Sequence, residues 1–229
     1  MRNTLVLPVG GNATRMLGLP KFLLPASEHE TLIEKHCRGA LGAGYDEVVV
    51  ITRPVYTEIL VGIFENLGLR INVITLGQPT LTMNETLLNG LSTIHNGEEF
   101  SLTIGLADSA FVGEDYSVTY TNLLKSPAMA ALGLFAIRAD QFGKLGQVLF
   151  NESNMALDIK DKNSECKYPF IWGLAKIPSS YLKSVDMNDQ HIGISLEKWI
   201  KAGVEVGVSL SSSEYFDCGT FSEYRKFLQ

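Results

Sequence analysis

A glycine-rich segment with two basic residues follows the first apolar run of the chain. The segment 8–15 reads PVGGNATR, and Lys21 follows six residues after Arg15. Adjacent glycines let backbone N–H groups turn inward toward a phosphate, and the guanidinium of Arg15 can add a forked, charge-assisted contact. Phosphate binding is one interpretation of this segment. A plain tight turn is the other, because the spacing matches neither the Walker nor the dinucleotide-binding pattern.

Two aspartates stand where a sheet would present ligands. Asp108 comes just after the apolar run 100–106, and Asp217 lies in the segment YFDCGT near the end of the chain. A carboxylate that follows a buried strand faces the edge where α/β sheets collect their ligands. Either residue could instead be an ordinary turn aspartate.

The elements that must position these residues alternate in the first half of the chain. β-Branched and apolar runs predict strands, and apolar residues at helical spacing predict the helices between them. The predicted strands are 4–7, 47–52, 70–76 and 100–106, and the predicted helices are 30–41, 55–67 and 84–95. This alternation predicts a parallel sheet with helices on both faces.

The second half changes character and predicts a small antiparallel extension of the same sheet. Its predicted strands are 129–138, 147–150, 155–160, 170–177, 204–210 and 215–216, and its predicted helices are 179–185, 194–202 and 221–228. With no linker or repeat, the chain reads as one α/β domain, 1–229, with a mixed, mostly parallel sheet flanked by helices. Residues 1–110 would form a nucleotide-binding half and residues 111–229 an acceptor-binding half.

Composition excludes several classes of protein. The net charge of −6 argues against a nucleic-acid binder, which normally needs a basic surface. No stretch has the roughly 18 apolar residues of a membrane helix. Three scattered cysteines, Cys37, Cys166 and Cys218, suggest reduced thiols in a cytoplasmic protein. The four histidines are separated in the sequence and suggest no catalytic group.

The N-terminal segments resemble the signature of the sugar-phosphate nucleotidyltransferases, roughly LAGGxGTR followed by PKxLxP. Ala13 replaces the third glycine of that signature, and the segment between Arg15 and Lys21 is shorter than in thymidylyl- and uridylyltransferases. The resemblance implies a Rossmann-like, GT-A-like nucleotidyltransferase domain in which Arg15 and Lys21 are catalytic. The nucleotide-binding residues that it implies are Gly10, Gly11, Asn12, Ala13, Thr14, Gln78, Thr82 and Met83.

The same resemblance implies a magnesium site. In that family a strand-ending Gly-Asp and a C-terminal Asp-Ile-Gly-Thr supply two metal-binding carboxylates. The corresponding residues here are Asp108, preceded by Ala107, and Asp217 in Asp-Cys-Gly-Thr. Mg²⁺ offsets the repulsion between two phosphorylated substrates and is typically held by one or two carboxylates plus phosphate oxygens. A shared ion requires both carboxylates to reach one edge of the sheet, facing the glycine loop across one crevice.

The resemblance is looser for the residues that would bind the nucleobase and the acceptor. Gln78, in the segment 77–86, falls where the family has a Gln-Pro segment along the nucleobase. Lys162 falls where the family has a lysine that binds the sugar phosphate, and Gly146 and Trp172 fall where it lines the sugar pocket. The alternatives are a polar turn before an N-cap at Asn84, a solvated lysine and a core tryptophan.

Together these features predict a Mg²⁺-dependent enzyme that condenses a nucleoside triphosphate with a sugar 1-phosphate, as in nucleotide-sugar and polysaccharide biosynthesis. One alternative is a cytidylyl- or uridylyltransferase for a non-sugar phosphorylated metabolite. Another is a non-catalytic nucleotide-binding regulatory domain of the same fold. A metal-activated glycosyltransferase would be expected to show Asp-x-Asp, whereas the run here is Asp108-Ser109-Ala110. A homo-oligomer is left open.

Overall fold

The apolar runs of the first half form the parallel centre of one large sheet. The computed structural model describes residues 1–11, 16–94 and 98–229. In this part of the chain β1 (Asn3–Pro8) pairs in parallel with β2 (Glu47–Thr52) and with β4 (Ser101–Gly105), and β2 pairs in parallel with β3 (Asn72–Thr75). The interior residues of β1, β2 and β4 are buried, as expected for strands covered on both faces.

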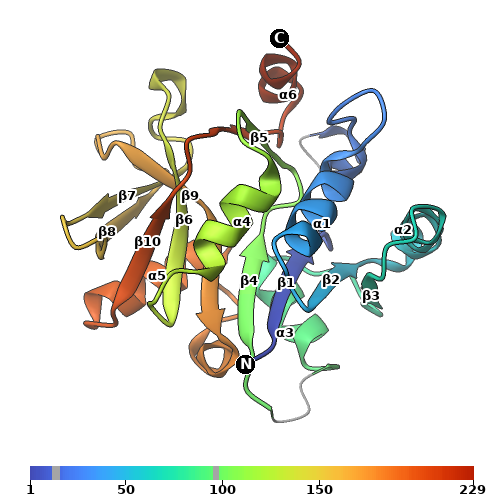
Figure 1. Ribbon diagram of the computed structural model, residues 1–229, viewed down its shortest axis with the longest axis horizontal. Coiled ribbons are helices and arrows are strands. Elements are labelled where there is room, and N and C mark those ends of the chain that lie inside the picture. The colour runs from blue at the N-terminus through green and yellow to red at the C-terminus, as the bar shows by residue number, and fades with distance from the viewer. Residues whose placement is uncertain (12–15, 95–97) are drawn as a thin grey trace.

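The second half adds antiparallel strands to the same sheet, as predicted. The long strand β9 (Phe170–Pro178) runs antiparallel to β4 on one side and to β6 (Ala130–Ala136) on the other. β10 (Val206–Leu210) closes that edge in parallel with β6, and the hairpin of β7 (Gly146–Phe150) and β8 (Ala156–Asp161) joins β9. The path of strands is β10-β6-β9-β4-β1-β2-β3 (Figure 1). The division at residue 110 stays a prediction, because the sheet is continuous across it.

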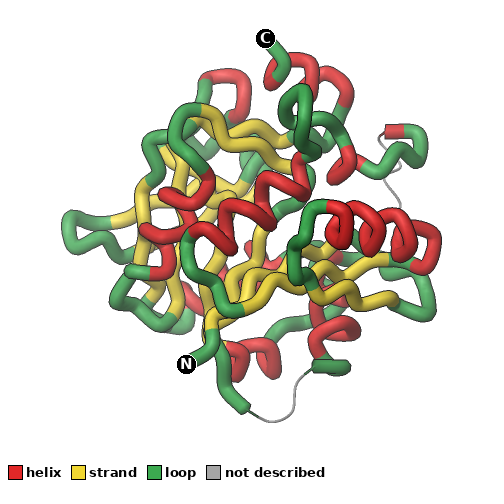
Figure 2. Tube along the Cα trace, turned by 45° about the vertical axis from the view of Figure 1, so that its right-hand side comes forward, coloured by secondary structure: helices red, strands yellow, loops and turns green. Residues whose placement is uncertain are grey.

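Helices cover both faces of the sheet (Figure 2). On one face lie α1 (Leu32–Gly42), α2 (Pro54–Asn66) and α4 (Tyr116–Leu124), whose apolar residues share one buried cluster with the strands. On the other face lie α3 (Met83–Leu91), the 3-10 turn η4 (Ser179–Ser184) and α5 (Ile192–Lys201), which share a second cluster. None of the helices described has the length and apolar character needed to cross a membrane.

One strand and one α-helix were not predicted from the sequence. β5 (Ser109–Val112) is only four residues long, and it pairs antiparallel with β11 (Glu214–Asp217) in a separate two-stranded ribbon. α4 is rich in β-branched and aromatic residues, which are poor helix formers. Tertiary packing outweighs that propensity, because α4 buries Tyr116, Thr119, Tyr120 and Leu123 at helical spacing and is capped by the side chain of Asp115.

Other predicted boundaries shift for local reasons. The segment 179–185 forms a 3-10 turn rather than an α-helix. The cap of α3 is Thr82, whose hydroxyl accepts the N–H of Glu85 at 3.0 Å, so the alternative of an N-cap at Asn84 is wrong. Asn84 is buried inside the helix and donates its amide to the carbonyl of Asp186 at 3.0 Å. The chain ends in α6 (Phe221–Phe227), which packs against β11.

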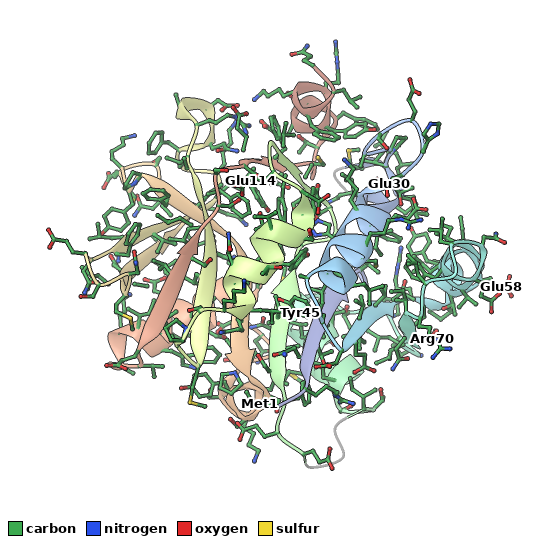
Figure 3. The ribbon with its side chains drawn as sticks, in the orientation of Figure 1. Met1, Glu30, Tyr45, Glu58, Arg70 and Glu114 are labelled. Carbon is green, nitrogen blue, oxygen red and sulfur yellow. The ribbon has the colours of Figure 1, made fainter. Side chains whose placement is uncertain are left out.

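The contact between α1 and α4 depends on a glycine. A Cβ at Gly39 would lie 2.4 Å from the Cβ of Tyr116, so any larger residue would push the two helices apart. Just beyond α1, Tyr45 is buried and donates its hydroxyl to Thr103 of β4 at 2.8 Å (labelled in Figure 3). These contacts fix α1 and α4 against the centre of the sheet.

His36 of α1 ties this layer to the β5–β11 ribbon. Its Nε2 lies 3.0 Å from the carbonyl of Ser109, which can only accept, so Nε2 carries the proton. Nδ1 then accepts from the hydroxyl of Tyr120 at 2.7 Å. Complete burial lowers the pKa of His36 from its ordinary 6.5 to about 4. The folded protein therefore holds a neutral imidazole at pH 7.

This network predicts a pH dependence of stability. His36 would protonate near pH 6.5 in the unfolded chain but only near pH 4 when folded, so stability is lost as the pH falls between those values. Between pH 7 and 4.5 the wild type should lose about 2–3 kcal/mol more unfolding free energy than His36→Gln. Urea unfolding at several pH values measures this difference. Parallel pH profiles for the two proteins would contradict it, and His29→Gln, at an exposed position, is the control.

Candidate active site

A cleft of about 270 Å³ opens at the carboxyl edge of the parallel strands. Four segments that each follow a strand contribute to its wall. These are the end of β1 and the residues after it, the first turn of α2 after β2, the loop after β3, and the turn after β4. This is the edge at which α/β sheets bind ligands. The cleft is therefore lined from the segments 8–15 and 77–86 and from Asp108, at the edge where the sequence predicts a ligand site.

Lys21 and Asp108 meet in the wall of this cleft. The Nζ atom of Lys21 lies 3.2 Å from Oδ2 of Asp108, and 14% and 33% of the two side chains are exposed. Lys21 begins the short 3-10 turn η2 (Lys21–Leu23), which Phe22 anchors by burying its ring in the core. Asp108 stands in the turn between β4 and β5. A cation and a carboxylate distant in the sequence are thus paired beside an open space.

Asp217 is brought beside Asp108 by the β5–β11 ribbon. Asp217 is paired with Ser109 in the register, and the N–H of Cys218 donates to the carbonyl of Asp108 at 2.9 Å. The Asp217 carboxylate accepts the N–H of Gly219 at 3.0 Å. Burial raises the pKa of the Cys218 thiol, and the charges of Asp108 and Asp217 raise it further. The charges of both carboxylates therefore reach the same buried thiol. Of the two aspartates, Asp108 is among the residues that line the cleft.

The donors near this point fit an oxygen-loving cation. In residues 1–11, 16–94 and 98–229 no group of three or more His, Cys, Asp or Glu side chains is arranged for a metal ion. Two neighbouring carboxylates are nevertheless what Mg²⁺ commonly takes from a protein, because phosphate oxygens and water complete its shell. Asp108 and Asp217 would be the residues to hold such an ion.

The glycine segment is described only in part. Gly10 packs against Thr80 of the opposite loop and Thr86 of α3, since a Cβ there would lie 3.1 Å from atoms of both. Gly11 lines the cleft. The remaining candidates of this segment, Asn12, Ala13, Thr14 and Arg15, lie outside the described residues.

The predicted base-binding residues have different surroundings. Gln78 is exposed and is not among the described residues that line the cleft. Thr82 and Met83 do line it. The Thr82 hydroxyl caps α3 and donates to the carbonyl of Met187 at 2.6 Å, and the Met83 N–H donates to the carbonyl of Gln190 at 2.9 Å. These groups hold the segment 186–190 against α3.

The predicted acceptor-side residues lie apart from the described lining of the cleft. Trp172 is 6% exposed, and a Cβ at Gly146 would come within 2.2 Å of its indole Nε1, so Gly146 makes room for this ring. The indole N–H is buried and has no partner in the described part of the chain. Lys162 is exposed, with a left-handed backbone of φ 48°, at the turn that follows β8.

A histidine that the sequence left isolated also reaches this region. His191 caps α5 by accepting the N–H of Gly193 on Nδ1 at 3.2 Å, which leaves its Nε2–H to donate to Asp161 at 3.0 Å. Its neighbour Gln190 lines the cleft, as does Tyr56 of α2. No sequence pattern points to these residues, because a tyrosine in the first turn of a helix and polar residues in the turn before another helix have many structural uses.

No protein-family model matches the sequence, and no curated protein sequence matches it. Solved structures match along almost the full chain. A UDP-glucose pyrophosphorylase in complex with UDP-glucose is 16% identical with a TM-score of 0.78, and 99% of this chain and 97% of that chain are covered.

Two further structures extend the likeness. A Bacillus anthracis protein assigned as a glucose-1-phosphate thymidylyltransferase, in complex with a sucrose, is 16% identical with a TM-score of 0.80 and coverage of 99% and 94%. A UTP-bound UGPase from Acinetobacter baumannii is 16% identical with a TM-score of 0.75 and coverage of 100% and 92%. Identity at this level speaks for the fold alone. The chain has the fold of the sugar-phosphate nucleotidyltransferases.

Proposed function

We propose that this protein is a nucleotidyltransferase that joins a nucleoside triphosphate to a sugar 1-phosphate and releases pyrophosphate. The observation that carries this proposal is the Lys21–Asp108 pair in the wall of the cleft, with Asp217 beside it on the neighbouring strand. The shared fold supports the same reaction class, since the similar structures include a UTP-bound UGPase and a UDP-glucose pyrophosphorylase.

The proposed reaction is one displacement at phosphorus. A phosphate oxygen of the acceptor attacks the α-phosphorus of the triphosphate, and the bond from that phosphorus to the bridging oxygen of the β-phosphate breaks. Both substrates are anionic, so the protein must mainly position them and stabilise charge. Mg²⁺, when bound, would neutralise phosphate charge between the two substrates.

Each residue of the site then has a defined task. The Lys21 ammonium would contact the triphosphate from its position against Asp108, and the family resemblance gives Arg15 a contact to the same phosphates. Asp108 and Asp217 would hold the cation. Because the Lys21–Asp108 pair is only partly exposed, each charge is set in place before a substrate arrives.

The acceptor would bind on the β7–β8 side of the cleft. We assign Lys162 to the acceptor phosphate, and Gly146 and Trp172 to the sugar. Lys162 is exposed at the turn after β8. The indole N–H of Trp172, buried beside Gly146, is a donor without a partner among the described residues. A non-sugar phosphate would use the same lysine, so the acceptor must be identified by assay.

Pyrophosphate release from the four nucleoside triphosphates, measured with a panel of sugar 1-phosphates and non-sugar phosphates, tests the proposed function. We expect release only when Mg²⁺, one triphosphate and a sugar 1-phosphate are all present. Release with a phosphorylated non-sugar alone would transfer the proposal to that acceptor. Triphosphate binding without release under any combination would indicate a nucleotide-binding regulatory domain instead.

Two lysine substitutions separate the nucleotide and acceptor sides. Lys21→Ala should lower kcat/KM by at least about tenfold for every acceptor, equivalent to roughly 1.4 kcal/mol of transition-state stabilisation. Lys162→Ala should raise the KM for the acceptor while calorimetric binding of the triphosphate stays as in the wild type. Lys125→Ala, at an exposed position after α4, is the control. Wild-type kinetics for a folded Lys21→Ala variant would remove this lysine from the mechanism.

A further inference from the structure

His191 joins two segments of the molecule that are distant in the sequence. It is the N-cap of α5, and its neighbour Gln190 lines the cleft. The His191 Nε2–H donates to Oδ2 of Asp161, the last residue of β8, at 3.0 Å. Asp161 is followed directly by Lys162. One hydrogen bond therefore connects the wall of the cleft to the turn that carries this exposed lysine.

The imidazole ring of His191 is held in one orientation. Its Nδ1 accepts the N–H of Gly193 at 3.2 Å, so the proton of the neutral ring is on Nε2. A Cβ at Gly193 would lie 2.9 Å from this Nδ1 and 2.7 Å from the ring of Trp172, so only a glycine fits between the two rings. The side chains of His191 and Asp161 are 13% and 21% exposed. The donor is thus set against the carboxylate with little freedom to turn.

The turn that begins at Asp161 has an unusual backbone. Lys162 has a φ of 48°, a left-handed conformation that residues other than glycine seldom adopt. Such a conformation costs free energy and persists only where neighbouring contacts impose it. On one side of Lys162, His191 holds the Asp161 carboxylate. On the other side, the buried amide of Gln147 donates to the carbonyl of Asn163 at 3.0 Å. The backbone from which Lys162 extends is therefore fixed on both sides.

We propose that His191 is a positioning residue for the acceptor: it holds Asp161 and thereby fixes the turn from which Lys162 reaches the acceptor phosphate. The inference rests on the proposed function, because it takes Lys162 as the lysine that binds this phosphate. A lysine on a fixed backbone loses less conformational freedom on binding than one on a mobile turn. The His191–Asp161 bond therefore lowers the KM for the acceptor and leaves triphosphate binding unchanged.

Two substitutions separate this role from the capping of α5. In His191→Asn the side-chain oxygen can still accept the N–H of Gly193, because asparagine is a favoured N-cap residue, but the side chain is too short to reach Asp161. In His191→Gln the amide nitrogen can reach Asp161 in place of Nε2, but the cap is lost. We expect His191→Asn to raise the acceptor KM by about tenfold with an unchanged melting temperature. We expect His191→Gln to keep a nearly wild-type acceptor KM while its melting temperature falls by roughly 2–4 °C.

A double variant tests whether His191 acts through Lys162. If it does, adding His191→Asn to Lys162→Ala should raise the acceptor KM no further, because the lysine that the turn positions is already absent. Steady-state kinetics with the preferred triphosphate and acceptor measure both KM values, and the KM for the triphosphate should stay as in the wild type in every His191 variant. His29→Asn, the same change at an exposed position, is the matched control.

The outcomes distinguish this inference from the proposed function. A wild-type acceptor KM in the folded His191→Asn variant would overturn it. So would a larger rise in His191→Gln than in His191→Asn, since activity would then follow the cap of α5, and so would additive effects of His191→Asn and Lys162→Ala. If the wild type releases no pyrophosphate with any acceptor, the proposed function fails as well. If the wild type is active and one of these three results is found, only the role of His191 fails.

Discussion

The pairing of β5 with β11 is the constraint on which the site depends. Each strand is four residues long, and together they bring the turn after β4 against the C-terminal part of the chain. Asp217 lies opposite Ser109, next to Asp108, only because this register holds. Without this pairing, nothing in the register of the strands would bring the carboxylate of Asp217 near that of Asp108.

Burial on both sides of the ribbon fixes that register. Phe111 and Tyr215 pack into the cluster beneath α1 and α4, whereas Ala110 and Phe216 pack into the small cluster beneath α6. A slip of one residue would exchange these two sets of side chains. The carbonyl of Tyr215 also accepts hydrogen bonds from Arg138 at 2.6 Å and Gln141 at 2.7 Å. The position of Asp217 is thus set by packing on either side of it.

The sequence predicted the large elements well and the connections between them less well. Runs such as EVVVIT at 47–52 and the alternation of strand and helix are local patterns, so the parallel sheet and its carboxyl-edge cleft could be anticipated. β5 is too short to leave a pattern, and the helix α4 overrides its own residue preferences through burial against α1 and the sheet. Both depend on contacts that only the folded chain makes.

The same distinction applies to the site. Lys21 and Asp108 belong to motifs of the sequence, and their side chains meet in the wall of the cleft. Gln78 also belongs to a motif, and it is exposed, whereas Leu81 of the same loop is among the residues that line the cleft. Tyr56 and His191 gave no signal in the sequence, since a tyrosine in a helix and a lone histidine have many structural uses. The order of the strands places Tyr56 at the cleft, and the turn before α5 places His191.

The central claim is that Asp108 and Asp217 hold one cation together. Mn²⁺, which prefers the same oxygen ligands as Mg²⁺, can be titrated into the nucleotide-bound protein and followed by electron paramagnetic resonance. The account predicts one tightly bound ion in the wild type, and an affinity at least about tenfold weaker in both Asp108→Asn and Asp217→Asn, a loss of roughly 1.4 kcal/mol or more. Asp46→Asn, at an exposed position, should bind as the wild type does. Unchanged Mn²⁺ affinity in a folded Asp217→Asn variant would contradict the shared site.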